Sequence, residues 1–228
     1  MTKDLFTGIA GVYDRMNHTL SLGLDRRWRR VAAACVENRP VRVLDLACGT
    51  GDFSLELSRR FPGVGLLGVD VTPAMLEIAK GKCAGAKMDF TLADATDLSA
   101  LPAGGFSLCA CAFGFRNFPD RPKALGEVRR VLASGGELLV LEFFRPANAL
   151  LGRLVSAWIS LLAWFFARRS ASAYKYLRES VKAMDSEEAF VEYASQKGFR
   201  LLSRRFMFPC CTCLHFAVRQ GEGGDDDE

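Results

Sequence analysis

A glycine-containing turn and several acidic residues around it stand out in the first half of the chain. The turn Gly49-Thr50-Gly51 comes just after Asp45, and Asp70 and Asp94 each end a later apolar run. Glycines permit the backbone conformations and close approaches that a nucleotide requires, and amide groups at the start of the following helix bind polar or anionic groups. Asp70 lies 19 positions beyond Gly51, the spacing at which an acid reaches ribose hydroxyls. These residues predict a nucleoside site.

Two features of the turn argue against a nicotinamide or flavin dinucleotide. The third glycine of a GxGxxG pattern is missing, and Asp52 would place negative charge beside a pyrophosphate. S-adenosylmethionine has a positive sulfur and no phosphate, so Asp45 and Asp52 suit its amino acid end. Asp94 follows the third apolar run, where it is expected near the adenine edge. The sequence therefore predicts S-adenosylmethionine as the cofactor.

Alternating strand and helix patterns predict the elements that position these acids. Parallel strands joined by helices form an open α/β sheet, which binds ligands at the carboxyl ends of its strands. The first five predicted strands are 42–47, 65–70, 88–93, 106–113 and 137–143. The helices between them are predicted at 52–61, 73–83 and 121–132, followed by a helix at 187–197 and strands near 200–208 and 212–219.

Longer motifs carry a family resemblance. DLACGTGD, GVDVTPAMLEIAK and ALGEVRRVLASGGELLVLEF resemble motifs of class I S-adenosylmethionine-dependent methyltransferases. YDRMNHTLSLGLDRRWRR, FGFRNFPD, LEFFRP and SAYKYLRES make the chain similar to the UbiE/MenG family, the C-methyltransferases of ubiquinone and menaquinone biosynthesis. The resemblance implies a Rossmann-like fold with a mostly parallel seven-stranded sheet and helices on both faces. It also implies one domain over 1–219, with a helical lid at 1–40 and an apolar helical insertion at 148–183.

The resemblance also implies which residues contact the cofactor. The residue before FGFRN is serine in some relatives but is Ala112 here, so we expect a backbone contact at that position. The cofactor-binding residues expected are Asp45, Gly49, Thr50, Gly51, Asp70, Val71, Asp94, Ala95 and Ala112.

The implied reaction is methylation of a ring carbon of a polyprenylated demethylmenaquinol, of the corresponding ubiquinol precursor, or of both. Arg116 is expected to stabilise phenolate charge or to position a water, Asn117 to orient a ring oxygen, and Tyr13 to close over the site. Two alternatives stay open: a methyltransferase acting on another small lipophilic molecule, and a non-catalytic subunit of a quinone-synthesis complex. The sequence separates neither the two quinol classes nor their isoprenoid chain lengths.

An uncharged stretch at 154–167 lies between Arg153 and Arg168-Arg169. Its 14 residues are too few to span a bilayer. Such a segment suits a buried helix over the pocket, and it equally suits an interfacial patch that admits a polyprenyl tail during transient membrane contact. We accordingly expect a cytoplasmic protein, with association at the inner face of the membrane left open.

Composition narrows the classes of partner, compartment and metal site that the chain could have. A formal charge of +4, with acids and bases mixed, does not call for a nucleic-acid partner. The chain has eight cysteines, several of them in apolar runs typical of core thiols, and the first residues lack the apolar core of a secretory signal. In one strand Cys210 would point to the opposite face from Cys211, Cys213 and His215, so we expect no tetrahedral metal site there. We expect 220–228 to be an acidic flexible tail, and a homodimer is left open.

Overall fold

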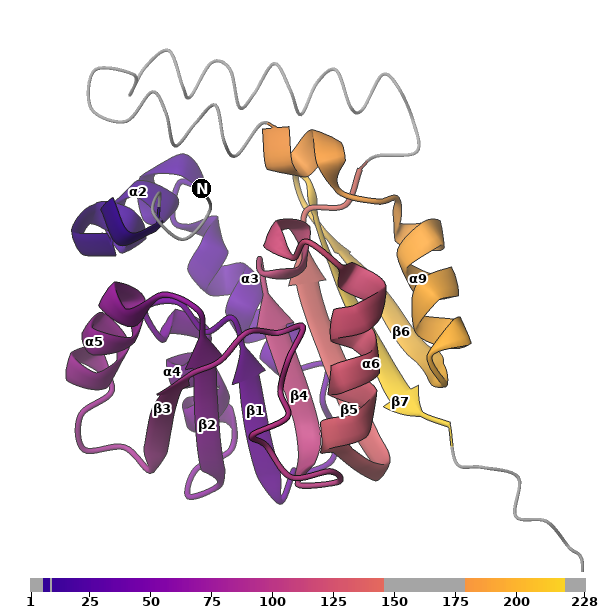
Figure 1. Ribbon diagram of the computed structural model, residues 1–228. Coiled ribbons are helices and arrows are strands. Elements are labelled where there is room, and N and C mark those ends of the chain that lie inside the picture. The colour runs from indigo at the N-terminus through magenta and orange to yellow at the C-terminus, as the bar shows by residue number, and fades with distance from the viewer. Residues whose placement is uncertain (1–5, 9, 146–178, 220–228) are drawn as a thin grey trace, which may run out of the picture.

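A computed structural model describes residues 6–8, 10–145 and 179–219. It contains a seven-stranded sheet in the order β3-β2-β1-β4-β5-β7-β6 (Figure 1). The first five strands pair in parallel, and β7 runs antiparallel between β5 and β6. This topology confirms the predicted fold class. The strands are β1 (Arg42–Leu46), β2 (Gly65–Asp70), β3 (Met88–Leu92), β4 (Phe106–Ala112), β5 (Leu132–Glu142), β6 (Phe199–Met207) and β7 (Cys211–Val218).

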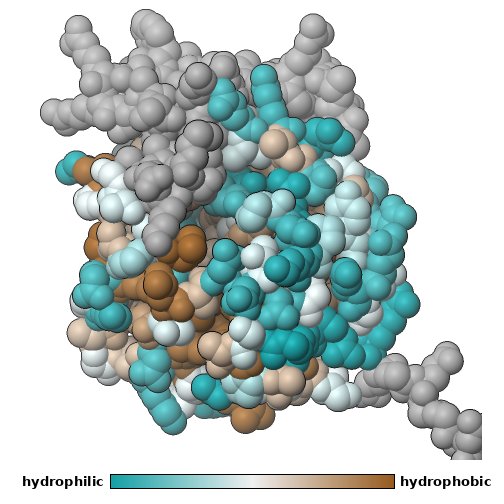
Figure 2. Space-filling view, viewed as in Figure 1, coloured by the Kyte–Doolittle hydropathy of each residue, from teal (hydrophilic) through white to brown (hydrophobic). Residues whose placement is uncertain are grey.

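Helices cover both faces of this sheet (Figure 1). The N-terminal helices α2 and α3 come before the first strand. Hydrophilic side chains predominate on the face that carries α6 and α9, whereas hydrophobic ones gather on the side that carries β2, β3 and α5 (Figure 2). The labelled helices are η1 (Ala10–Val12), α2 (Tyr13–Leu20), α3 (Leu24–Ala33), α4 (Asp52–Arg60), α5 (Pro73–Lys82), η2 (Phe115–Asn117), α6 (Arg121–Val131) and α9 (Glu187–Gln196), and residues 6–8 and 179–183 are also helical.

Strand β1 lies between the two hydrophobic layers. Val43 packs in the cluster that includes residues of α3 and α4, whereas Leu44 and Leu46 pack in the cluster that includes residues of α6 and α9. Successive side chains of a strand point to opposite faces, so this apolar run is buried on both sides. The packing holds the end of β1, and hence the glycine turn that follows it.

Most strand ends lie within one residue of the prediction, and two of the differences have a cause in the backbone. Strand β5 begins at Leu132 rather than at 137, because the chain passes directly from α6 into the strand. An irregularity in its pairing with β4 accommodates the glycines, and Gly135 has a φ of 69°. Strand β4 ends at Ala112, one residue early, because Phe113 turns into the left-handed region with a φ of 61°.

Several predictions fall outside the described residues. They concern the segment 154–167, the tail 220–228 and all of the insertion except 179–183, which is helical. Within the described ranges, no helix combines the length and apolar character needed to cross a membrane.

Candidate active site

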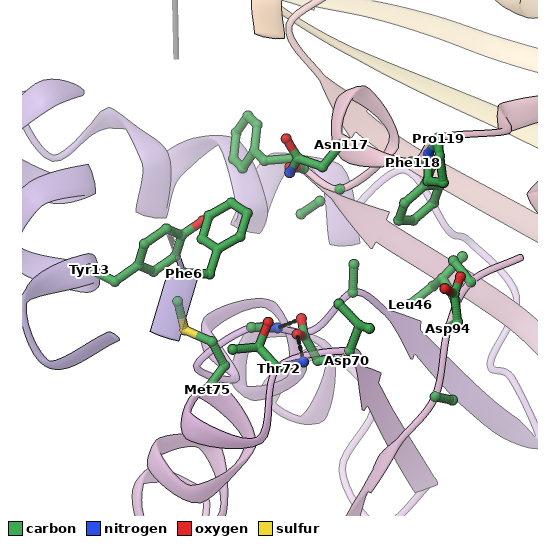
Figure 3. Close-up of a pocket in the computed structure, with 18 residues that line it drawn as sticks. Phe6, Tyr13, Leu46, Asp70, Thr72, Met75, Asp94, Asn117, Phe118 and Pro119 are labelled. Carbon is green, nitrogen blue, oxygen red and sulfur yellow. Dashed lines mark hydrogen bonds between the residues drawn. The ribbon is translucent and has the colours of Figure 1, made fainter. Parts of the chain in front are cut away.

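A cavity of about 390 Å³ lies at the carboxyl ends of the central strands (Figure 3). Its wall is built from loops after β1, β2, β3 and β4, together with the N-terminal segment. This is the edge at which an open parallel sheet binds ligands. The predicted site residues in the wall are Tyr13, Gly49, Asp70, Val71, Asp94, Ala95, Ala112 and Asn117.

Asp70 connects the glycine turn to the start of α5. The amide of Gly49 donates to its Oδ2 and the amide of Thr72 donates to its Oδ1, each at 2.9 Å (Figure 3). Burial raises the pKa of Asp70, while these amide hydrogen bonds act in the opposite direction. The carboxylate is thus held in one orientation at the floor of the cavity, where its remaining lone pairs can accept hydrogen bonds from ribose hydroxyls.

The part of the wall around Asp94 combines an acid with apolar groups. Asp94 accepts hydrogen bonds from the amide and hydroxyl of Thr96, which hold its side chain at the end of β3. Val71 presents an exposed apolar side chain, with 42% of its surface accessible, and the apolar side chain of Leu46 also lines the cavity. Apolar side chains with a hydrogen-bonding edge suit a planar heterocycle such as adenine.

Two non-glycine residues adopt left-handed backbone conformations in the wall. Ala47 follows β1 with a φ of 55°, and Phe113 follows β4 with a φ of 61°. Such conformations cost on the order of 1–3 kcal/mol each and are concentrated at functional sites. The two loops are closely packed, because a Cβ on Gly114 would lie 2.9 Å from the Ala47 Cβ. Glycine at position 114 is therefore a steric requirement.

The charge of the cavity wall fits one kind of nucleoside. Asp70 and Asp94 are acidic, and none of the described residues in the wall is Lys, Arg or His. A pyrophosphate bound there would meet like charge without compensation, whereas a sulfonium nucleoside would meet opposite charge. The residues present therefore fit S-adenosylmethionine, with Asp70 suited to the ribose and Asp94 with Val71 suited to the adenine.

Three predicted cofactor residues lie behind the wall rather than in it. Asp45 is 1% exposed, and the hydroxyl of Ser54 donates to its Oδ2. Burial raises the pKa of Asp45 to about 7, despite that hydrogen bond. Thr50 is also buried and binds Asp14, and Gly51 supports the start of α4 with a φ of 84°. In this structure these residues support the backbone of the turn and place a buried acid next to it, without lining the cavity.

Arg116 also lies outside the cavity wall. Its Nη1 donates to Glu142 Oε1 and to the carbonyl oxygen of Phe113, both at 2.7 Å. The backbone amide of Arg116 donates to Glu142 Oε2 at 3.2 Å. The side chains of Arg116 and Glu142 are 8% and 0% exposed. This geometry ties the loop after β4 to the end of β5, so the predicted direct contact of Arg116 with substrate stays a prediction.

Asn117 and Tyr13 occupy the side of the cavity opposite Asp70 (Figure 3). Asn117 is held partly by donation from its Nδ2 to the carbonyl oxygen of Phe113 at 3.3 Å. The Tyr13 ring packs edge-on against Phe6, with ring centroids 5.8 Å apart. These two uncharged polar groups face the space above the acids, where an acceptor ring has room to enter.

A separate polar cluster lies beside the glycine turn. His18, Asp25 and Asp52 form the one group of potential metal ligands found among the described residues, with ligand atoms within 4.8 Å of one another. Cationic side chains already fill this cluster, because Arg29 Nη1 is 2.6 Å from Asp25 Oδ2 and Lys82 Nζ is 2.8 Å from Asp52 Oδ1. The arrangement is that of an ion-pair network.

Sequence reasoning missed several wall residues. Phe6, Met75 and Phe118 supply apolar surface. Met75 lies in the first turn of α5 directly after Thr72-Pro73, a helix start that the sequence does show. The contribution of Phe6 depends on how the N-terminal segment folds back over the sheet, and no local pattern encodes that.

Comparison with known proteins gives consistent results. A model of the ubiE/COQ5 methyltransferase family matches residues 1–219. A demethylmenaquinone methyltransferase of Deinococcus radiodurans is 43% identical over 213 residues, covering 90% of this chain and 88% of the relative. A ubiquinone/menaquinone biosynthesis C-methyltransferase UbiE of Geobacter sulfurreducens is 37% identical, covering 89% of this chain and 82% of the relative. A solved S-adenosylmethionine-dependent methyltransferase of Thermotoga maritima shares the fold with a TM-score of 0.70 at 18% identity, covering 96% of this chain and 100% of that one.

Proposed function

The chain belongs to the ubiE/COQ5 methyltransferase family, and from this premise we propose that it methylates a ring carbon of a polyprenylated quinol. The acceptor is a demethylmenaquinol, with the corresponding ubiquinol precursor as a second acceptor of the same class. The observation that carries the proposal is the composition of the cavity wall: Asp70 and Asp94 on one side, Asn117 and Tyr13 on the other. The names of the relatives support the quinol as the substrate class.

S-adenosylmethionine supplies an electrophilic methyl group on a positively charged sulfur. Asp70 would hold the ribose, because amides from two loops fix its carboxylate. Asp94, Ala95 and Val71 would hold the adenine, and Gly49 and the loop at Ala112 would border the remainder of the cofactor. The role proposed for Asp45 is electrostatic, since its carboxyl group is buried next to the turn and the negative form favours a positive ligand.

The protein must also favour negative charge on the acceptor ring. Loss of a hydroxyl proton would make the adjacent ring carbon electron-rich, so that it could take the methyl group as S-adenosylhomocysteine leaves. The hydrogen on that carbon would then be lost as the ring recovers its hydroxyl group, so the reaction releases one proton overall. The Asn117 amide and the Tyr13 hydroxyl are hydrogen-bond donors that can orient the ring oxygen and stabilise charge on it. The apolar rings of Phe6 and Phe118 exclude water from the same space, which strengthens these interactions.

Arg116 fits a positioning role better than direct contact. Its guanidinium binds Glu142 and the carbonyl of Phe113, the residue whose left-handed backbone directs the loop toward the cavity. Asn117 follows immediately in the chain and lies in the wall. We therefore assign Arg116 the task of holding Asn117 in place.

The decisive experiment supplies the purified protein with methyl-labelled S-adenosylmethionine and a panel of reduced acceptors. The panel contains a short-chain demethylmenaquinol, a demethoxyubiquinol analogue, a sterol and a polyketide. The expected product is the quinol with the label on a ring carbon, identified by mass spectrometry. If the label is transferred only to the sterol or the polyketide, the substrate is another lipophilic molecule and the quinol proposal is wrong. If the cofactor binds but no label is transferred, the protein is a non-catalytic subunit.

Asn117→Ala tests the acceptor side of the cavity. We expect kcat to fall about 10²-fold, because a donor to a developing oxyanion is lost, while affinity for S-adenosylhomocysteine stays near that of the wild type. Asn117→Asp is the matched variant: it keeps the shape but opposes negative charge, so it should be at least as impaired. Wild-type turnover in both variants would remove Asn117 from the mechanism.

Access to a polyprenylated substrate bears on localisation. We propose a cytoplasmic protein that meets the inner face of the membrane transiently. The support comes from the uncharged stretch at 154–167 with its arginine flanks. Vesicles containing anionic lipid should therefore accelerate methylation of a long-chain quinol more than methylation of a short-chain one, and equal rates on both would argue against membrane contact.

A further inference from the structure

An open polar hollow lies beside the cavity, where the N-terminal helix α2 meets the glycine turn and the end of α5. It is lined by polar and ionisable side chains, among them Asp14 and His18 of α2, Asp52 at the start of α4 and Lys82 at the end of α5. Asp14 follows Tyr13, which lies in the wall of the cavity itself. The hollow thus lies between the glycine turn and helix α2, which is part of the predicted lid and is called the lid below.

Lys82 is the centre of this region. Its ammonium group donates to Asp14 Oδ2 on α2, to Thr50 Oγ1 in the turn at 3.1 Å, and to Asp52 Oδ1 at 2.8 Å. An ammonium group has three protons, so these acceptors match its full donor capacity. Lys82 is the last residue of α5, where the helix dipole also favours a cation.

Asp14 makes a second link from the lid to the turn. The hydroxyl of Thr50 donates to Asp14 Oδ1, so both carboxylate oxygens of Asp14 are engaged across the interface. Thr50 is 2% exposed and lies between the two glycines of the turn. Its hydroxyl is therefore committed to the lid, and the position of the lid is coupled to the shape of the turn.

We propose that Lys82 and Asp14 are positioning residues that lock helix α2 onto the glycine turn and thereby hold Tyr13 over the cavity. The consequence is that closure of the lid and binding of the cofactor are linked. This proposal rests on the proposed function only for the identity of the cofactor and of the methylated substrate. The locking contact itself is made entirely by residues of this chain.

The exposure of the pair suits a contact that opens and closes. Side chains of Lys82, Asp14 and Asp52 are 24%, 28% and 22% exposed. Ion pairs with this access to solvent contribute little net stability and are weakened by salt. Such a contact can release the lid for cofactor exchange without unfolding the protein.

A double-mutant cycle on Lys82→Met and Asp14→Asn tests the proposal. The measurement is the Kd of S-adenosylhomocysteine by calorimetry, which requires no quinol. Each single variant should bind about 10-fold more weakly, and the double variant should be close to the worse single variant rather than about 100-fold weaker, because both changes break one shared contact. Raising the salt concentration should weaken binding to the wild type and leave Lys82→Met nearly unchanged.

Lys80→Met is the matched control. Lys80 lies on the same helix and pairs with Glu77 at 2.8 Å, but both side chains are more than half exposed, at 51% and 72%. This variant should bind like the wild type. Lys82→Arg keeps the charge and should recover most of the affinity lost in Lys82→Met, and circular dichroism confirms that each variant is folded.

Additive losses, or affinities of Lys82→Met and Asp14→Asn equal to that of Lys80→Met, would overturn the proposal. Failure of the function itself has a different signature. In that case the wild type binds S-adenosylhomocysteine with the predicted coupling but methylates none of the quinols.

Discussion

Two ion-pair regions flank the cavity, and they differ in burial. On the β4 and β5 side, Arg116 and Glu142 are 8% and 0% exposed. On the side of α2, Lys82, Asp14 and Asp52 are each between 22% and 28% exposed. The first region joins a loop to the core of the sheet, whereas the second joins a helix to a turn.

The difference in burial suggests that the cavity wall beside β4 is fixed and that the wall formed by α2 can move. A buried pair is costly to break, because removing one partner leaves the other charge without compensation in a poorly solvated place. A partly exposed pair opens at smaller cost, because water replaces each lost contact. We infer that the loop carrying Asn117 keeps one geometry while the lid carrying Tyr13 moves.

The largest effect is expected from Glu142→Gln. The substitution keeps the shape but removes the charge that compensates Arg116, and it weakens acceptance from the amide of Phe143, which donates to Oε1 at 2.8 Å. We expect a loss of about 3–5 kcal/mol in the free energy of unfolding, measured by urea denaturation. Loss of the loop geometry should also lower kcat more than it weakens cofactor affinity.

Glu56→Gln is the control for this comparison. The Glu56 side chain is 12% exposed, but it pairs with Arg30 and Arg59, whose side chains are 73% and 68% exposed and stay hydrated after the substitution. Its removal should change the free energy of unfolding by less than about 1 kcal/mol. Equal losses in Glu142→Gln and Glu56→Gln would mean that burial does not distinguish the fixed wall.

A second effect concerns Asp45, a buried acid that lies outside both pairs. Its folded pKa of about 7 is above the ordinary value of 3.8, so the folded protein holds a proton that the unfolded chain releases between these pH values. The associated stability is present below about pH 4 and is lost as the pH rises through about 7. Asp45→Asn removes this dependence, so its stability relative to the wild type should rise by up to about 1.4 kcal/mol per pH unit in that window.

Urea denaturation of both proteins at about pH 5 and at about pH 7.5 measures this difference. Asp70, whose pKa burial also raises, is present in both proteins, but its charge helps to raise the pKa of Asp45, so the two acids are coupled and the difference reports them together. Parallel changes with pH in the two proteins would show that Asp45 is charged throughout the range. The negative charge of Asp45 would then have to be stabilised by its surroundings as well as Arg116 stabilises that of Glu142.

The fold follows closely from local sequence patterns, because the main signals are short in range. The apolar run 42–47 gave β1 within one residue, and Thr72-Pro73 marked the start of α5 correctly. The start of β5 was wrong by five residues, because glycines at 135 and 136 indicate a turn in the sequence but lie in an irregular part of the strand. Local glycine signals do not distinguish a turn from a bulge.

The site was predictable where it depends on sheet topology alone. Parallel strands end at one edge, so Asp70 and Asp94 had to meet there, and both are in the wall. The direction in which Arg116 points depends on the short helix η2 and on Glu142, which is 26 positions away. The contact of Lys82 with Asp14 spans 68 positions and requires the lid to be folded over the turn. No spacing rule encodes contacts of that kind.

The smallest effect is expected for the stability of Lys82→Met, and it bears most directly on the movable side. The ammonium group contacts three acceptors, yet all the carboxylates involved remain open to water after the substitution. We expect a change of less than about 1 kcal/mol in the free energy of unfolding, together with more rapid protease cleavage within the first 20 residues. A loss as large as that of Glu142→Gln would mean that the lid is part of the rigid core. Unchanged stability with faster cleavage at α2 would show that the contact holds a segment in place without holding the fold together.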